Sequence, residues 1–234
     1  MFGDLTLIQV FKSSPTMVVL LACSVVTVGF AVERLLYFMS SSVDARRFMN
    51  DLTGHLKGGN PRAALDFCQR QQSPIARVMA QGCLNLNRSQ EEQVQRLDTA
   101  IELEQVEMER NIGVLGTMAS IAPLLGLFGT VVGIIRAFAD IARTGSGGGA
   151  VVAMGVSEAL LTTAAGIIVA VVATVFFNVF VRRIRSRVAQ LEDAREHWLS
   201  IVSQLQRRRQ TAPAQPQPGA TAAPRKPVGE PVGV

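Results

Sequence analysis

The apolar residues of this chain are gathered into three long runs without charge. Charged residues are absent between Lys12 and Glu33, between Arg110 and Arg136, and between Glu158 and Arg182. Each run holds about 20 residues or more, which is the length a helix needs to cross the hydrocarbon core of a bilayer. The pattern therefore predicts an all-α membrane protein with three transmembrane helices, over residues 16–38, 115–140 and 152–181.

Basic residues are distributed unevenly around these runs, and this asymmetry predicts the orientation. Residues 1–15 and the connection 141–151 hold one basic residue each, whereas residues 33–110 hold ten. Lys and Arg gather on the cytosolic side of membrane proteins. We therefore expect residues 1–15 and 141–151 outside, and residues 39–114 and the C-terminus inside. The first run continues well past Cys23, so we interpret it as a retained anchor rather than a cleaved signal peptide.

Three capping sequences predict helix starts within residues 39–114. Asn60-Pro61 and Ser73-Pro74 each place a capping side chain before a proline at the first helical position. Ser89 opens a capping box, with acidic residues in the first turn. Apolar residues then recur at helical spacing as far as Leu115. This periodicity predicts one unbroken helix that rises from the cytosol into the second span.

The third span is expected to continue into the cytosol as a helix over residues 182–206. Its apolar residues form a heptad-like stripe, interrupted by Arg195 and made of Val188, Leu191, Trp198, Val202 and Leu205. We interpret the stripe as a helix-packing face, and it indicates neighbours from other subunits. Residues 207–234 are rich in Pro, Ala, Gln and Gly. They hold too little apolar surface to offset the entropy of ordering, so this tail is predicted to be disordered.

Composition argues against several other classes of protein. The net charge of +5 mostly reflects the topology, and the basic residues lack the interleaved aromatic residues of a nucleic-acid surface. Cys23, Cys68 and Cys83 form no CxxC motif or His-Cys cluster, so neither a metal site nor a redox site is indicated. The glycine-rich residues 145–149 lack the ending of a phosphate-binding loop. No cofactor and no enzymatic activity are expected.

Small residues mark the faces of the second and third spans that are predicted to pack against other helices. Pro123, Gly126, Thr130 and Gly133 fall on one face of the second span at three- and four-residue spacing. Gly129 and Gly133 have the separation found where helices approach closely. The predicted packing residues are Pro123, Gly126, Gly129, Gly133 and Gly166.

Three polar residues within the spans are candidates for conducting an ion. Glu158 lies roughly 9 Å inside the outer surface, where an acid is costly unless it faces a wet cavity or a partner. A Glu that reaches out to solvent is the alternative. Thr130 and Thr163 lie at a similar depth of roughly 15 Å, so antiparallel neighbours would bring their hydroxyls close to Glu158. For Thr130, simple helix packing remains the alternative.

Four further charged residues are interpreted as anchors at the membrane surfaces. Arg136 and Asp140 are four residues apart near the outer end of the second span and are expected to pair with each other. Glu33 and Arg34 end the first span at the inner headgroups.

The second and third spans, which contain these polar residues, resemble the signature helices of the ExbB/TolQ family. This family is related to the flagellar stator subunit MotA. The resemblance is carried by PLLGLFGTVVG at residues 123–133 and GVSEALLTTAAG at residues 155–166. Glu33-Arg34-Leu35 resembles the family's first-span ending, and residues 59–65 resemble its cytosolic helical hairpin. The similarity covers roughly residues 5–205. Three spans favour ExbB/TolQ over MotA, which has four.

This resemblance implies a homopentameric ring in the bacterial inner membrane, held together chiefly by the small-residue faces. The N-terminus would be periplasmic and the C-terminus cytoplasmic. It also implies a partner of the ExbD/TolR kind, with a single span that carries an essential Asp, and an effector of the TonB/TolA or motility type. Within this chain, Thr130, Glu158 and Thr163 would line the proton path.

Three functional hypotheses stay open at this point. The first is a stator subunit that couples the proton motive force to mechanical work on a periplasmic or outer-membrane system. The second is a structural membrane scaffold, in which the small residues serve only packing. The third is a passive ion channel without mechanical output.

Overall fold

Residues 15–41, 43–144 and 149–211 are described by the computed structural model, and their regular structure is entirely helical. Three helices are long and apolar enough to cross a membrane. They are α2 (Pro15–Ser40), α7 (Ile112–Thr144) and α8 (Gly149–Thr211). The predicted all-α architecture with three spans is therefore confirmed. The predictions for residues 1–14, for the turn at 145–148 and for the tail after Thr211 fall outside the described residues.

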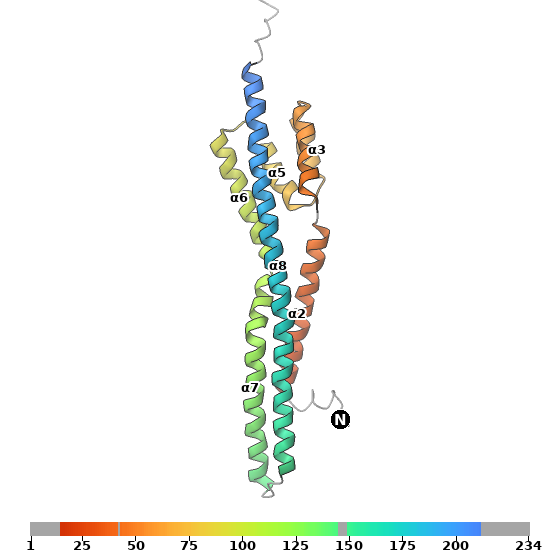
Figure 1. Ribbon diagram of the computed structural model, residues 1–234, viewed down its shortest axis with the longest axis vertical. Coiled ribbons are helices and arrows are strands. Elements are labelled where there is room, and N and C mark those ends of the chain that lie inside the picture. The colour runs from red at the N-terminus through yellow and green to blue at the C-terminus, as the bar shows by residue number, and fades with distance from the viewer. Residues whose placement is uncertain (1–14, 42, 145–148, 212–234) are drawn as a thin grey trace, which may run out of the picture.

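The three spans form a slender bundle at one end of the molecule (Figure 1). α7 and α8 lie side by side along their whole spanning length, and α2 packs against both. Near the start of α2, Met17 and Leu20 are buried against Leu125 of α7 and Ala165 of α8. α8 is one helix of 63 residues, so it runs from the far end of the bundle into the part of the chain beyond the spans without interruption. The third span thus continues as a helix, as predicted, and the helix extends to Thr211 rather than ending at residue 206. Residues 207–211, predicted to begin the disordered tail, are therefore helical. The cytosolic location of this continuation stays a prediction.

Four shorter helices lie outside the spans and, with the end of α8, form the unit that is predicted to be cytosolic and is called the helical domain below. They are α3 (Ala45–Lys57), α4 (Pro61–Gln69), α5 (Pro74–Leu84) and α6 (Gln90–Glu109). Asn60, Ser73 and Ser89 cap α4, α5 and α6, each accepting a hydrogen bond from a backbone N–H of the first turn at 3.2, 3.4 and 3.3 Å. The three predicted helix starts are therefore correct. Asp44 caps α3 in the same way and was not predicted.

Trp198 of α8 is the centre of the core of the helical domain. Its side chain is fully buried among α5, α6 and α8, and its indole N–H donates to the side chain of Gln93 at 3.4 Å. Leu191 and Val202 on the same stripe of α8 are also buried. We expected this stripe to meet neighbouring subunits, but it packs against the helices of its own chain. The correction arises because residues 45–109 fold back onto α8, which heptad spacing alone does not reveal.

The predicted continuous helix into the second span is interrupted between α6 and α7. Arg110 has a non-helical ψ of 137°, and Asn111 has a left-handed φ of 65°. Asn is one of the few residues besides Gly that adopts this region readily. The apolar spacing hid the break because Met108, Ile112 and Leu115 are all buried in one cluster, so the periodicity continues across the joint.

Arg34 of α2 holds this joint from the side. Its side chain is 1% exposed, which places it inside the protein rather than among headgroups. The guanidinium donates to both carboxylate oxygens of Glu33, at 2.7 and 2.8 Å, and to the carbonyl of Met108 at 3.4 Å. It also lies over the ring of Tyr37, 4.9 Å from the centroid. The expected surface anchor is therefore a buried contact that binds the last turn of α6.

Replacing Asn111 tests whether the left-handed joint constrains the fold. Asn111→Val should lower the free energy of unfolding by about 1–2 kcal/mol, because a β-branched residue is strained at positive φ. Asn111→Gly removes the same side chain without this strain and serves as the matched control. Thermal unfolding of the full-length protein in detergent would show the difference, and equal stability of the two variants would contradict a left-handed joint.

Candidate functional site

The backbones of α7 and α8 approach each other closely along a seam of small residues. A Cβ atom added at Gly166 would lie 2.5 Å from the carbonyl oxygen of Ala122 and 3.0 Å from the Cα of Gly126. At Gly126 it would lie 3.0 Å from the Cα of Thr163, and at Gly133 it would lie 2.9 Å from the Cβ of Ala159. Real Cβ atoms essentially never come within 3.0 Å of such neighbours, so a side chain at Gly166 or Gly133 would force the helices to shift, and one at Gly126 would be tightly crowded.

These contacts join two helices of the same chain. From the family resemblance we expected the small-residue faces chiefly between subunits of a ring, whereas Gly126, Gly129, Gly133 and Gly166 all lie between α7 and α8 of one chain. α8 begins at Gly149, soon after α7 ends at Thr144, and the two consecutive helices pack against each other. Pro123 is half-buried inside α7, and its packing role stays a prediction.

Thr162 is the most deeply placed hydroxyl of the seam, and it was not singled out from the sequence. Its side chain is 1% exposed, and its hydroxyl donates to the carbonyls of Ala159 at 2.7 Å and Gly126 at 3.3 Å. A Cβ atom at Gly129 would lie 2.5 Å from this hydroxyl oxygen. The glycine at position 129 therefore provides the space for Thr162. Its neighbour Thr163 was predicted instead, from its approximate depth and from the family resemblance.

The two predicted threonines lie beside the seam and bond to helix carbonyls. Thr163 Oγ1 donates to the carbonyl of Gly126 at 3.1 Å, and Thr130 Oγ1 donates to that of Leu127 at 2.6 Å. Both side chains are only partly buried. Because each hydroxyl donates its proton to the backbone, its oxygen lone pairs can still accept a hydrogen bond from water or a partner.

Glu158 lines a cavity of about 260 Å³ between the C-terminal half of α7 and the start of α8. Arg136 and Asp140 line the same cavity, so the two residues expected to form a separate anchor pair adjoin the acid. Thr162 lies at the inner end of the lining, whereas Thr130 and Thr163 are not part of it. The structure therefore connects Glu158 to Thr163 only indirectly, through Thr162 and the Gly126 carbonyl that both threonines share.

The cytosolic cysteines lie far from this cavity. Cys68 of α4 and Cys83 of α5 are free, buried thiols in the cytosolic core. Their side chains adjoin each other. The hydrogen bond between the two thiols, together with burial, raises the pKa of Cys83, whereas the same hydrogen bond lowers the pKa of Cys68. Cys83 in this state is a poor nucleophile and metal ligand. Across the described residues, no group of three or more His, Cys, Asp or Glu side chains is placed to hold a metal ion.

Comparison with known proteins places this seam within a known family. A sequence profile of the MotA/TolQ/ExbB proton channel family matches residues 70–193, which is more than half of the chain. The chain belongs to this family. The matched region contains Thr130, Glu158, Thr162 and Thr163, together with all the glycines of the seam.

Several proteins with ExbB and TolQ names are similar to part of the chain. The biopolymer transport protein ExbB of Pseudomonas putida is 45% identical over 108 residues, which are 46% of this chain and 33% of that protein. ExbB of Salmonella typhimurium is 44% identical over 109 residues, 47% of this chain and 45% of that protein. The Tol-Pal system protein TolQ of Pseudomonas aeruginosa is 39% identical over 84 residues, 36% of each. The matches thus span between a third and just under half of each relative's length.

The seam can be tested with two glycines of the two spans. Gly166→Ala should lower the free energy of unfolding by roughly 1–3 kcal/mol, because its methyl group would meet the Ala122 carbonyl and one of the two backbones would have to shift. Gly113→Ala in α7 is the matched control, since nothing lies within 4 Å of its added Cβ. Unfolding in detergent would compare them, and a stable Gly166→Ala variant would contradict the close approach of the helices.

Proposed function

We propose that this chain is the ring-forming subunit of a proton channel in the bacterial inner membrane. In this role it couples the proton motive force to mechanical work on a periplasmic or outer-membrane system. One observation carries the proposal: the cavity of about 260 Å³ lined by Glu158 lies inside the predicted spans of a member of a proton channel family. The names of its relatives, biopolymer transport and Tol-Pal system proteins, support a load of this kind.

The proton path in this proposal begins at Glu158 and continues along threonine hydroxyls. The carboxylate takes up a proton in the outer cavity, where Arg136 and Asp140 make the lining polar. Thr162 adjoins that cavity, and Thr163 shares the Gly126 carbonyl with it. Thr130 extends the path on α7. A hydroxyl can both donate and accept hydrogen bonds, which suits a relay that includes water.

A second acid is required deeper in the membrane. Residues 115–139 and 159–181 contain no Asp or Glu, so this chain offers no further carboxylate along the path. We propose that a single-span partner of the ExbD/TolR kind supplies an Asp at this depth, inside a homopentameric ring. Each charge that crosses 100 mV provides about 2.3 kcal/mol, so a few protons are enough for useful work. A TonB/TolA-like or motility-type effector would receive that work.

Isosteric replacements of the path residues test this proposal. Glu158→Gln and Thr163→Val should each lower proton flux by about tenfold or more in proteoliposomes that contain the chain and its partner, because each removes a group that carries or relays the proton. Thr162→Val should have an effect of similar size. Flux is measured with a pH-sensitive dye under an imposed membrane potential, and assembly is checked by native mass spectrometry.

Two control variants separate the path from general damage. Thr27→Val removes a buried hydroxyl of α2 that bonds only to the carbonyl of Cys23 at 2.8 Å, and Glu192→Gln removes an exposed acid of cytosolic α8. Both should leave the flux unchanged. Full flux in Glu158→Gln would refute the proposed path. Flux from this chain without a partner would instead identify a passive channel, and no flux under any condition would identify a scaffold.

A further inference from the structure

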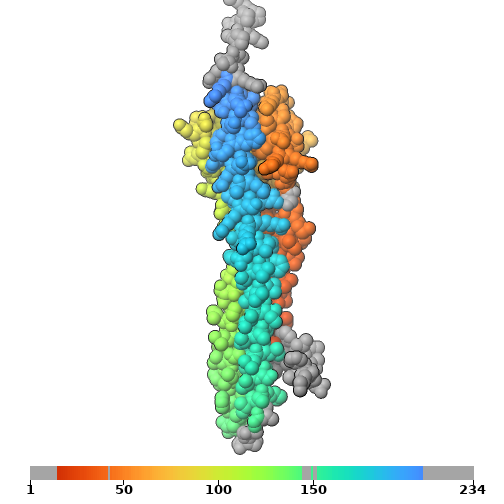
Figure 2. Space-filling view, viewed as in Figure 1, coloured from red at the N-terminus to blue at the C-terminus, as the bar shows by residue number. Residues whose placement is uncertain are grey.

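Two cytosolic flanks of the chain lie on opposite sides of α8. α6 is on one side and α3 is on the other, as both the ribbon and the space-filling view show (Figures 1 and 2). The sequence of α6 contains seven acidic residues and one basic residue. α3 contains two arginines and a lysine against a single aspartate. The charges of this domain are therefore separated between its two flanks.

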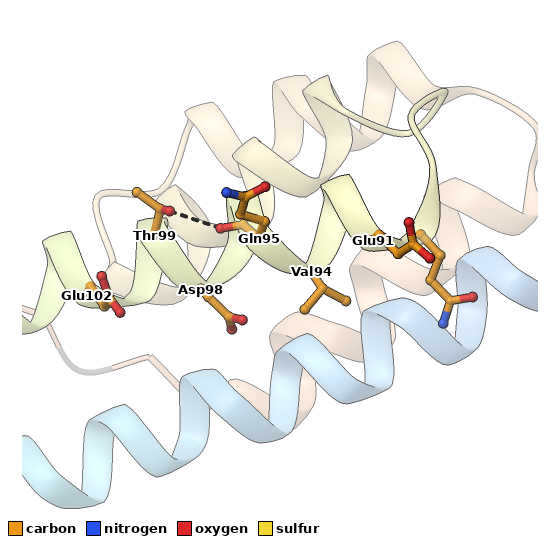
Figure 3. A pocket seen from close by; sticks show the side chains of 7 residues that line it. Glu91, Val94, Gln95, Asp98, Thr99 and Glu102 are labelled. Atoms are coloured by element: carbon orange, nitrogen blue, oxygen red, sulfur yellow. Dashed lines mark hydrogen bonds between the residues drawn. The ribbon is translucent and has the colours of Figure 1, made fainter.

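The exposed face of α6, called its outer face below, forms the wall of an open groove with an acidic lining. It has a volume of about 710 Å³ and is lined by Glu91, Asp98 and Glu102 together with the polar residues between them (Figure 3). Asp98 forms an ion pair with Arg195 of α8. Within the part of the chain that the structure describes, Glu91 and Glu102 have no ion-pair partner. Two carboxylates of this face are thus available to another molecule.

The same face carries exposed apolar side chains closer to the membrane. Leu103 is 66% exposed and Val106 is 67% exposed, although α6 already buries Leu97, Ile101 and Met108 on its inner side. α6 therefore has two apolar faces, of which the chain itself covers one. Large apolar side chains that adjoin one another on a cytosolic surface indicate a protein contact.

The opposite flank contains a groove of complementary charge. It lies between the start of α3 and the cytosolic part of α8, has a volume of about 900 Å³ and is lined by Arg46, Arg183 and Arg187. Arg46 and Arg183 are exposed and form no ion pair with any described residue. Of the two acids in the groove, Asp44 is engaged in capping α3, and Asp193 is exposed on α8.

The two surfaces lie at the same level along the molecule. α6 runs antiparallel to α8, and the ion pair between Asp98 and Arg195 sets their register. Glu102 lies four residues closer to the membrane than Asp98, which places it roughly 6 Å lower, near the level of Leu191. The basic groove extends along α8 from Arg183 to His197, so it includes this level. In a ring closed around an axis parallel to α8, each residue meets residues of equal level on the next subunit.

We propose that the outer face of α6 in one subunit binds the groove between α3 and α8 of the next subunit. In this head-to-tail contact Glu102 faces Arg46 of the neighbour, and Leu103 and Val106 are covered by the apolar parts of its groove. The occupant of both surfaces is thus a second copy of this chain. The inference rests on the ring that is part of the proposed function, and it identifies the cytosolic surface that closes that ring.

Charge reversal of the full-length chain in membranes tests the contact. Glu102→Arg and Arg46→Glu should each lower the fraction of oligomer by roughly five- to tenfold at low salt, because each places like charges opposite one another. The double variant should recover most of the oligomer. Asp66→Arg reverses an exposed acid of α4, outside both surfaces, and should have no effect. Equal loss in the double and single variants, or no loss in either single variant, would overturn the proposal.

Cross-linking between differently tagged chains tests the geometry independently. One chain carries Leu103→Cys and the other carries Asn50→Cys, an exposed residue of the basic groove. The native cysteines are replaced by Ala in both chains. A short bismaleimide should link a Leu103→Cys chain to an Asn50→Cys chain, giving a product that carries both tags. It should not link two chains with the same substitution, because a head-to-tail contact brings different surfaces together. Self-linked Leu103→Cys chains would show a symmetric contact and overturn the proposal.

These outcomes can be distinguished from a failure of the proposed function. An oligomer that resists both charge reversals and gives no mixed cross-link would refute this contact while leaving the proton path untouched. A mixed cross-link without proton flux would support the contact and refute the path. If Arg46→Glu released bound anionic phospholipid but left the oligomer intact, the groove between α3 and α8 would be a lipid-binding site rather than a contact with a second copy of the chain.

Discussion

The close approach of α7 and α8 is the constraint on which the rest of this molecule depends. At Gly166 and Ala122 the two backbones are so near that a single methyl group would overlap a carbonyl oxygen. This approach brings the Gly126 carbonyl within reach of two threonine hydroxyls. It also sets the width of the cavity that holds Glu158. The packing residues and the polar residues of the spans therefore belong to one arrangement, and neither set has its geometry without the other.

The spans are connected to the other half of the molecule in two different ways. α8 is continuous over 63 residues, so one helix joins the span to Trp198 in the core beyond it. α7 is separated from α6 by the left-handed Asn111, and Arg34 binds the end of α6 beside this joint. A buried guanidinium is costly unless it is paired, and Glu33 provides that pairing. The chain thus combines one continuous helical connection with one interrupted connection between its two halves.

A single copy of this chain leaves much of its surface without a protein partner. Within the spans, exposed side chains such as Leu124 and Ile168 can face lipid or a neighbouring subunit. Leu103 and Val106 of α6 lie outside the spans, and a subunit contact of the kind we propose would remove their exposure to water. The separation of charge between α6 and α3 also favours a contact between subunits. The acidic face of α6 and the basic groove beside α3 lie at the same level along α8, which suits the head-to-tail contact that we propose.

The sequence by itself determined the three spans, the all-helical class and three of the four cytosolic caps, because these depend on charge-free length and on residues next to one another. Residue spacing also marked glycines that lie between α7 and α8, and the position of Glu158 along the third apolar run marked it as an acid within a span. Only the tertiary structure decided which helix each glycine faces, that Thr162 adjoins Thr163 at the Gly126 carbonyl, and that Arg136 and Asp140 share the cavity of Glu158. It also revealed the joint at Asn111 and the folding of the cytosolic helices onto Trp198. These features depend on the rotation of α7 and α8 about their own axes and on long-range contacts, which residue spacing along one helix does not specify.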